Sequence, residues 1–275
     1  MERVRFAPSP TGPLHIGGVR TALFNSLSTK SRKGVFVGRV EDTDQNRYVP
    51  GAEEYILKTM DWLGLEVDEG PGTESPWGPY RQSERKDIYQ NYIQKLIEKG
   101  KAYYAFDSKE ALELERGKAE AKKEAFKYGQ HNRHRMKNSL SLNTSEVTQL
   151  LKNEDYVIRL KNDALGTIKV QDELRGNVHV EAKEIDDKIL MKADGMPTYH
   201  FANVVDDHLM EITCVIRGEE WLPSLPIHQL IYEGFGWEAP KFIHLPLILK
   251  PEGKGKLSKR DGSKGGFPVS PFRRE

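Results

Sequence analysis

The 275-residue sequence contains a single cysteine, Cys214, and lacks any apolar run long enough to cross a bilayer as a helix. One cysteine excludes a framework of internal disulfides and a cysteine-rich zinc cluster. The first ten residues, MERVRFAPSP, include no apolar stretch of the kind that signal peptides carry. We therefore expect a soluble, cytoplasmic protein that makes no membrane contact.

The sequence also lacks a large net charge, since 42 Lys and Arg residues offset 41 Asp and Glu residues. These charges are unevenly distributed, however. Residues 41–74 carry a net charge of −8, whereas residues 108–137 carry +4 and residues 250–275 carry +5. Two separate basic segments in a nearly neutral protein could hold a polyanion at two places. For residues 108–137, an exposed helix surface explains the charge equally well.

The first 40 residues predict a strand, a loop, a helix and a second strand. Apolar and basic side chains alternate over Arg3–Ala7, which predicts a short strand. The prolines and glycine of Pro8–Pro13 predict a loop, and apolar residues at helical spacing after Gly18 predict a helix. Val35–Val40 predicts the second strand. This order is typical of a βαβ unit, in which the two strands run parallel.

After residue 40, the composition of the chain changes at two points. Glu53–Leu63 and Ile88–Ile97 predict helices, and residues 108–153 are polar, charged and helix-prone. Apolar, strand-rich character then returns. The strands that we expect are Tyr156–Leu160, Gly166–Val170, Asn177–Val180, Ile189–Met191, Thr198–Val205, Ile212–Ile216 and Ile243–Leu249. This pattern predicts an α/β domain that is interrupted by an insertion.

The segment Pro8–Gly18, PSPTGPLHIGG, has the composition of a phosphate-binding loop. It leaves a strand and opens a helix, so that backbone amides and the positive helix end can face a phosphate. Gly17 and Gly18 permit close approach of the backbone. His15 can donate a hydrogen bond to a phosphate oxygen as negative charge builds there. A purely structural turn would explain the prolines but not His15.

The second candidate motif is KLSKR, which spans residues 256–260 between glycines. Lys256, Lys259 and Arg260 would suit a mobile clamp on a polyphosphate. Taken alone, this motif is equally typical of a basic surface loop.

The strings HIGG and KLSKR are similar to the two signature motifs of class I aminoacyl-tRNA synthetases. The resemblance narrows to the bacterial glutamyl-tRNA synthetase family through RFAPSPTGPLHIGGVRTALFN, VEDTD, MDWLGLEVDEGP, YHFANVVDDHLM, VIRGEEW and GKLSKRDG. It covers nearly the whole chain, but it extends only to the catalytic half of that family, whose members continue after KLSKR into an anticodon-binding half.

The resemblance implies a Rossmann-like parallel-sheet nucleotide-binding domain, interrupted by an inserted α+β domain that binds the tRNA acceptor end. We assign residues 1–101 and 188–249 to the catalytic domain and residues 102–187 to the insertion. Residues 250–275 would form the KLSKR loop and the start of a truncated stem-contact region.

The implied activity is ATP-dependent activation of L-glutamate to glutamyl-adenylate, followed by transfer to the terminal adenosine of tRNA(Glu). ATP with Mg²⁺ would be a substrate, and the expected partners of this monomer are tRNA(Glu), ATP and L-glutamate. We expect no metal site, because Ala102–Ser108 lacks the cysteines of the zinc knuckle that some relatives carry there.

The resemblance also implies roles for individual residues. Those implied in catalysis are His15 and Lys259, and those implied in ATP binding are His15, Gly17, Gly18, Glu220, Trp221, Leu222, Lys256, Lys259 and Arg260. Those implied in glutamate binding are Arg5, Ala7, Ser9, Glu41, Tyr199, Asn203 and Arg217. Among these, Arg5 and Arg217 would bind carboxylates as forks, and Glu41 would bind the ammonium group. Our candidates for tRNA binding are Lys122, Lys123, Arg133 and Arg135.

Three other interpretations stay open at this point. A shorter paralogue that glutamylates a modified base of tRNA(Asp) also lacks the anticodon-binding half. Other nucleotidyltransferases with a His-x-Gly-His loop would explain the HIGG string and part of KLSKR. A synthetase-like binding module without activity is the third, although it predicts decay of motifs that are intact here.

Overall fold

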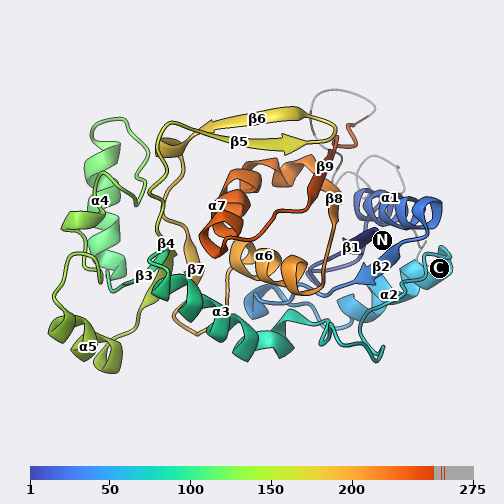
Figure 1. Ribbon diagram of the computed structural model, residues 1–275, viewed down its shortest axis with the longest axis horizontal. Helices are drawn as coiled ribbons and strands as arrows, with labels where there is room; N and C mark the ends of the chain where they lie inside the picture. Colours follow the sequence, from blue (N-terminus) through green and yellow to red (C-terminus); the bar gives the residue numbers. More distant parts are fainter. Residues whose placement is uncertain (251–254, 256, 258–275) are drawn as a thin grey trace.

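The computed structural model describes residues 1–250, 255 and 257. Within these residues a four-stranded parallel sheet forms the centre of the molecule (Figure 1). Its strands, in spatial order, are β2 (Val35–Gly38), β1 (Arg3–Phe6), β8 (Cys214–Gly218) and β9 (Lys241–Leu245). Helix α1 (Ile16–Arg32) connects β1 to β2, which pair in parallel, so the predicted βαβ unit is confirmed.

Helices cover both faces of this sheet, as a parallel sheet requires. On one face, α1 and α2 (Ala52–Trp62) pack against β1 and β2 through residues such as Ala22, Ile56 and Phe36. On the other face lie α3 (Lys86–Glu98), α6 (Tyr199–Leu209) and α7 (Leu225–Phe235).

The prediction of a strand at Thr198–Val205 is wrong, because these residues open α6. Every residue from Phe201 to Asp207 is buried in this helix. The polar residues of this stretch, Asn203, Asp206 and Asp207, are buried too, and the short apolar run before Asp206 does not by itself distinguish a strand from a buried helix. The adjacent Val204 and Val205, which favour strands in general, reinforced the error.

The part of the chain that connects β2 to β8 contains the strands of a second sheet, which is antiparallel. This sheet contains β3 (Ala102–Ala105), β4 (Val157–Leu160) and β7 (Ile189–Met191). The polar segment between β3 and β4 forms α4 (Lys109–Glu120) and α5 (Thr144–Asn153). The boundaries that we assigned to an inserted domain stay a prediction.

A hairpin of β5 (Thr167–Asp172) and β6 (Gly176–Glu181) extends from this region to the central sheet (Figure 1). At its tip, the backbone N–H of Glu173 donates to the carbonyl oxygen of Phe242 in β9 at 2.9 Å. Short 3₁₀ helices complete the described structure at Gln45–Arg47, Gln82–Arg85, Arg133–Arg135, Ala182–Glu184 and Glu219–Ser224. No helix in the described part of the chain is both long and apolar enough to cross a membrane.

A buried charge cluster joins the sheet to α6. The carboxylate of Asp207 accepts hydrogen bonds from Arg5 Nε at 3.0 Å and from Arg39 Nη1 at 2.7 Å. The neighbouring Asp206 accepts one from Arg85 Nε at 2.8 Å. Burial alone would raise the pKa of the Asp207 carboxyl, but the guanidinium groups of Arg5 and Arg39 lower it below its ordinary value. Both aspartates are therefore anchors for buried cations.

Replacing Asp206 with alanine should strongly destabilise the fold, because it leaves Arg85 buried without its carboxylate. We expect a loss of about 3–5 kcal/mol in the free energy of unfolding. Urea denaturation measures this loss. The control is Glu54→Ala, which removes an exposed pair with Lys58 and should leave the midpoint unchanged. Equal midpoints for the two variants would show that the cluster contributes nothing.

Two histidines meet where α6 packs against α7. His200 Nδ1 lies 3.3 Å from His228 Nε2, and the two rings meet nearly edge to face at 5.4 Å. Burial lowers the pKa of His200 to about 4 and the pKa of His228 well below its ordinary value. Both rings are therefore neutral at pH 7.

This burial predicts a loss of stability in mild acid. Below pH 6.5 the unfolded chain binds protons at its histidines, whereas folded His200 stays neutral down to about pH 4. The stability should therefore fall as the pH decreases from about 6.5 to about 4. His200→Gln should make this decrease shallower, as measured from urea midpoints at several pH values. An identical pH dependence in the variant would contradict the assignment.

Candidate active site

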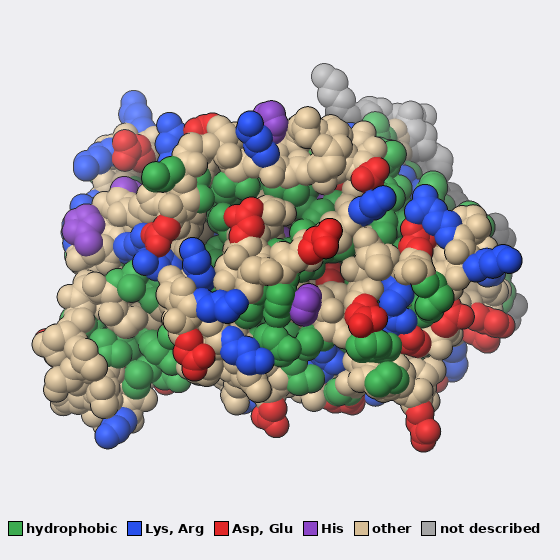
Figure 2. All heavy atoms as spheres, in the orientation of Figure 1, with side chains coloured by type: hydrophobic (Ala, Val, Ile, Leu, Met, Phe, Trp, Pro, Cys, Tyr) green, Lys and Arg blue, Asp and Glu red, His purple; other side chains and the backbone are tan. Residues whose placement is uncertain are grey.

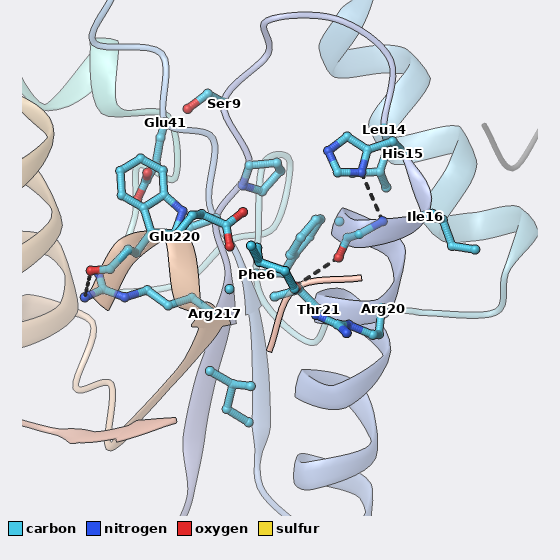
Figure 3. A pocket seen from close by; sticks show the side chains of 18 of the residues that line it. Phe6, Ser9, Leu14, His15, Ile16, Arg20, Thr21, Glu41, Arg217 and Glu220 are labelled. Atoms are coloured by element: carbon cyan, nitrogen blue, oxygen red, sulfur yellow. Dashed lines mark hydrogen bonds between the residues drawn. The ribbon is translucent and has the colours of Figure 1, made fainter. Parts of the chain in front are cut away.

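An open cleft of about 210 Å³ lies at the carboxyl ends of β1 and β8, beside the first turn of α1 (Figure 3). Ligands of open parallel sheets collect at this edge. The cleft brings together most of the residues that the sequence singled out. These are Arg5, Ala7, Ser9, His15, Gly17, Gly18, Glu41, Tyr199, Asn203, Arg217, Glu220 and Trp221.

We also predicted four other residues to bind ATP. Leu222 lies outside the lining of the cleft and packs against the hydrophobic core. The other three, Lys256, Lys259 and Arg260, lie outside the described residues. One described residue of the same motif, Leu257, lines the cleft, and its backbone N–H donates to the carbonyl oxygen of Ile248 at 2.8 Å.

The loop after β1 places His15 at the N-terminus of α1. His15 caps the helix, because its Nδ1 accepts a hydrogen bond from the backbone N–H of Gly17 at 3.0 Å. An imidazole that accepts at Nδ1 while neutral carries its proton on Nε2. His15 therefore presents an N–H donor beside a helix end that carries partial positive charge. Figure 3 shows His15 across the cleft from Glu41 and Arg217.

The two glycines after His15 are required by close contacts. A Cβ atom at Gly17 would lie 2.7 Å from His15 Cε1, and one at Gly18 would lie 2.5 Å from Leu14 Cδ1. Both distances are shorter than carbon atoms tolerate. A side chain at Gly17 would therefore displace the imidazole from the position in which it caps α1.

Glu41 is held rigidly at the opposite side of the cleft. Its Oε1 accepts hydrogen bonds from Arg39 Nη2 at 3.0 Å and from Asn203 Nδ2 at 3.1 Å. Its other oxygen accepts none from the residues that the structure describes. This carboxylate therefore keeps one oxygen available for a cationic group.

Arg5 is anchored through one nitrogen only. Its Nε donates to Asp207, while its terminal Nη1 and Nη2 donate no hydrogen bond to the described part of the chain. Since Arg5 lines the cleft, these nitrogens can bind a ligand there.

Arg217 is a buried cation that is surrounded by neutral groups. It is 5% exposed. Its Nε donates to His244 Nε2 at 2.9 Å, its Nη1 to the Tyr199 hydroxyl at 2.8 Å, and its Nη2 to the Trp221 carbonyl oxygen at 3.4 Å. Within residues 1–250, no carboxylate lies within ion-pair distance of Arg217. Arg3, Arg5, Arg39 and Arg85 are also buried, and each has a carboxylate partner. Arg159 is buried as well and forms no ion pair within the described structure, but it lies over the Tyr128 ring and outside the lining of the cleft.

An aromatic pair forms the wall next to Arg217. The rings of Tyr199 and Trp221 lie 4.3 Å apart between centroids, tilted by 32°. Trp221 is 40% exposed, so its indole is accessible from the cleft. Tyr199 is partly buried and lines the cleft.

The candidates for tRNA binding lie just after α4 and in the 3₁₀ helix Arg133–Arg135. Lys122 and Lys123 are exposed, and Arg135 pairs with Glu115 at 3.4 Å. Arg133 forms ion pairs with Asp163 and with Asp187, the latter at 3.1 Å, so its charge is compensated within the protein. Figure 2 shows acidic and basic side chains interspersed over the visible face. The role of these four residues stays a prediction.

Three residues that hold the site residues in position were not predicted from the sequence. Arg39 and Asp207 orient Glu41 and Arg5, and His244 contacts Arg217. The pair of aspartates inside the apolar run of α6 was the available signal. No group of three or more His, Cys, Asp or Glu side chains in the described structure is arranged to hold a metal ion.

Comparison with known proteins shows which family this chain matches. Residues 2–266 match the family described as tRNA synthetases class I (E and Q), catalytic domain. The curated glutamate–tRNA ligase of Christiangramia forsetii is 62% identical over 271 residues, which cover 98% of this chain and 54% of that protein. That of Flavobacterium johnsoniae is 59% identical with the same coverage. The chain thus spans about half the length of the curated relatives that it matches.

A solved structure matches the fold closely. The crystal structure of a glutamate tRNA ligase from Elizabethkingia meningosepticum in complex with its amino acid has a TM-score of 0.95 and 56% identity. The match covers 98% of this chain and 54% of that chain. The chain therefore belongs to the class I tRNA synthetase family of the E and Q type and has the fold of its catalytic domain.

Proposed function

We propose that the chain activates L-glutamate with ATP to glutamyl-adenylate and transfers the glutamyl group to the terminal adenosine of tRNA(Glu). The observation that carries this proposal is that one cleft contains both Arg217, which has no carboxylate partner in the described part of the chain, and the helix N-terminus that His15 caps. The first site suits a carboxylate and the second suits a phosphate. The names of the relatives support the same reaction.

Glutamate carries two carboxylates and one ammonium group, and the cleft has complementary groups for them. Arg217 and the terminal nitrogens of Arg5 bind carboxylate oxygens. The open oxygen of Glu41 binds the ammonium group, while Asn203 holds that carboxylate in place. Tyr199 fixes the Arg217 guanidinium from the side. The backbone of Ala7 and the side chain of Ser9 border the same space.

ATP with Mg²⁺, as the second substrate, occupies the side of the cleft at α1. His15 Nε2–H donates to a phosphate oxygen, and the backbone at Gly17 and Gly18 allows the phosphates to approach. Glu220 and Trp221 border the space for the adenosine. Within the KLSKR motif, Lys256, Lys259 and Arg260 would neutralise the phosphates, whereas Leu222 supports the wall from the core.

The reaction needs no nucleophile from the protein. An oxygen of the glutamate α-carboxylate attacks the α-phosphorus of ATP. The bond between that phosphorus and the oxygen that bridges it to the β-phosphorus breaks. Pyrophosphate leaves with the electron pair. A ribose hydroxyl of the tRNA then attacks the carbonyl carbon, and AMP leaves as the hydroxyl proton is lost to solvent. Positioning and charge stabilisation supply the catalysis.

The tRNA acceptor end would bind the segment between β2 and β8, with Lys122, Lys123, Arg133 and Arg135 near its phosphates. The shorter paralogue that acts on tRNA(Asp) is disfavoured, since curated relatives at 55–62% identity are named glutamate–tRNA ligases.

The direct test is mass spectrometry of a mixture of this chain with ATP, Mg²⁺, glutamate and tRNA. We expect glutamyl-adenylate or glutamyl-tRNA together with AMP. Glutamine should give at least about a hundredfold less product, because its neutral amide leaves a buried guanidinium unpaired. ATP binding without either product, or comparable activation of glutamine, would contradict the proposal.

Replacing Arg217 with glutamine should weaken glutamate binding without unfolding the protein. The change orphans no carboxylate in the described structure, so we expect only a small change in the melting temperature. The glutamate concentration at half-maximal rate should rise by at least about thirtyfold, whereas that for ATP should stay within about twofold. The matched control is Arg175→Gln, whose arginine pairs with Glu219 outside the cleft lining. Equal effects on both substrates would remove the assigned role.

A further inference from the structure

The contacts of Arg217 continue behind the cleft into the β5–β6 hairpin. Arg217 Nε lies 2.9 Å from His244 Nε2, and His244 Nδ1 lies 2.7 Å from Asp172 Oδ2. Arg217 and His244 are register partners on the adjacent strands β8 and β9, whereas Asp172 ends β5. His244 and Asp172 are completely buried. Of these three residues, Arg217 lines the cleft, whereas His244 and Asp172 do not.

The chemistry of the three groups fixes one protonation state. A guanidinium N–H can only donate, so His244 Nε2 must accept. The imidazole is then neutral, with its proton on Nδ1, and donates that proton to Asp172. Burial and the positive charge of Arg217 lower the pKa of His244 to about 4, which agrees with a neutral ring at pH 7.

Asp172 is itself fixed by backbone donors. Its Oδ1 accepts from the N–H groups of Leu174 at 3.0 Å and Arg175 at 2.8 Å. Its Oδ2 accepts from the backbone N–H of His244 at 3.1 Å, as well as from the ring. The carboxylate therefore cannot turn without breaking the hairpin tip, and each oxygen has a defined set of donors.

We infer that Asp172 and His244 are positioning residues, which select the imidazole tautomer that accepts from Arg217 Nε and so aim the guanidinium into the cleft. This inference rests on the proposed function, because it treats Arg217 as a ligand for glutamate. Neither residue touches the substrate. Their effect is on the orientation of Arg217 and should appear in the affinity for glutamate.

Asp172→Asn tests this assignment with a change of the same shape. The amide oxygen is needed by the N–H groups of Leu174 and Arg175, so the amide NH₂ is left facing the His244 ring and also its backbone N–H, which loses its acceptor whatever side chain residue 244 carries. The NH₂ donates to Nδ1, which moves the ring proton to Nε2 and sets it against the Arg217 N–H. We expect the dissociation constant of L-glutamate, measured by calorimetry, to rise about tenfold. Binding of a non-hydrolysable ATP analogue should change less than about twofold.

The His244→Gln background separates positioning from a merely structural effect. A glutamine at this position carries an amide oxygen that can accept from Arg217 without help from Asp172. In this background, Asp172→Asn should therefore change the glutamate dissociation constant by less than about twofold. The control is Glu181→Gln, which makes the same acid-to-amide change at the open end of the hairpin, opposite Thr167.

The possible outcomes are distinct. A loss of glutamate affinity in Asp172→Asn that disappears in the His244→Gln background supports the inference. Unchanged affinity in Asp172→Asn, or an equal loss in both backgrounds, overturns the inference while leaving the proposed function intact. Failure of the unmodified chain to bind L-glutamate overturns the proposed function and this inference with it.

Discussion

The central feature of this cleft is the buried guanidinium of Arg217, which has no carboxylate partner among the residues that the structure describes. Of the five other buried arginines in the described structure, four have carboxylate partners, and the fifth, Arg159, lies over the Tyr128 ring outside the cleft. Arg3 forms a two-pronged pair with Glu69, and Arg39 and Arg85 bind the aspartates of α6. An uncompensated charge in such surroundings costs several kcal/mol. A chain that retains this charge at the wall of an open cleft is best explained by an anionic ligand that completes the pair.

The arrangement of α6 explains how one helix can serve both the cleft and the core. Tyr199, Asn203 and Asp207 follow one another at intervals of four residues, so they lie on the same face of the helix. The first contacts Arg217, the second Glu41, and the third Arg5 and Arg39. A single rigid element therefore aligns the groups that we assign to the carboxylate and the ammonium of glutamate. The neighbouring Asp206 fixes the rotation of the same helix through Arg85.

The first part of the fold and His15 could be predicted from local signals, whereas Tyr199, Asn203 and most other site residues came from the resemblance to the synthetase family. The βαβ unit followed from alternation, glycines and prolines within 40 residues, and His15 followed from a loop that opens a helix. The alternation of Arg3 and Arg5 with Val4 and Phe6 was a true strand signal, although the basic face of this strand is buried as well.

The contacts that could not be predicted join residues that lie far apart in the sequence. Asp172 meets His244 across 72 residues, and Arg39 meets Asp207 across 168. No local pattern records such pairs. Helix α6 was not predicted for a related reason, because its aspartates bind buried arginines far away in the sequence and its short apolar run is equally typical of a strand.

A crystal structure of this chain with L-glutamate bound would test the role of Arg217 directly. We expect a glutamate carboxylate within hydrogen-bond distance of an Arg217 Nη atom, and the ammonium group beside Glu41. Glutamate that occupies the cleft with both carboxylates away from Arg217, or that binds elsewhere on the molecule, would contradict this role.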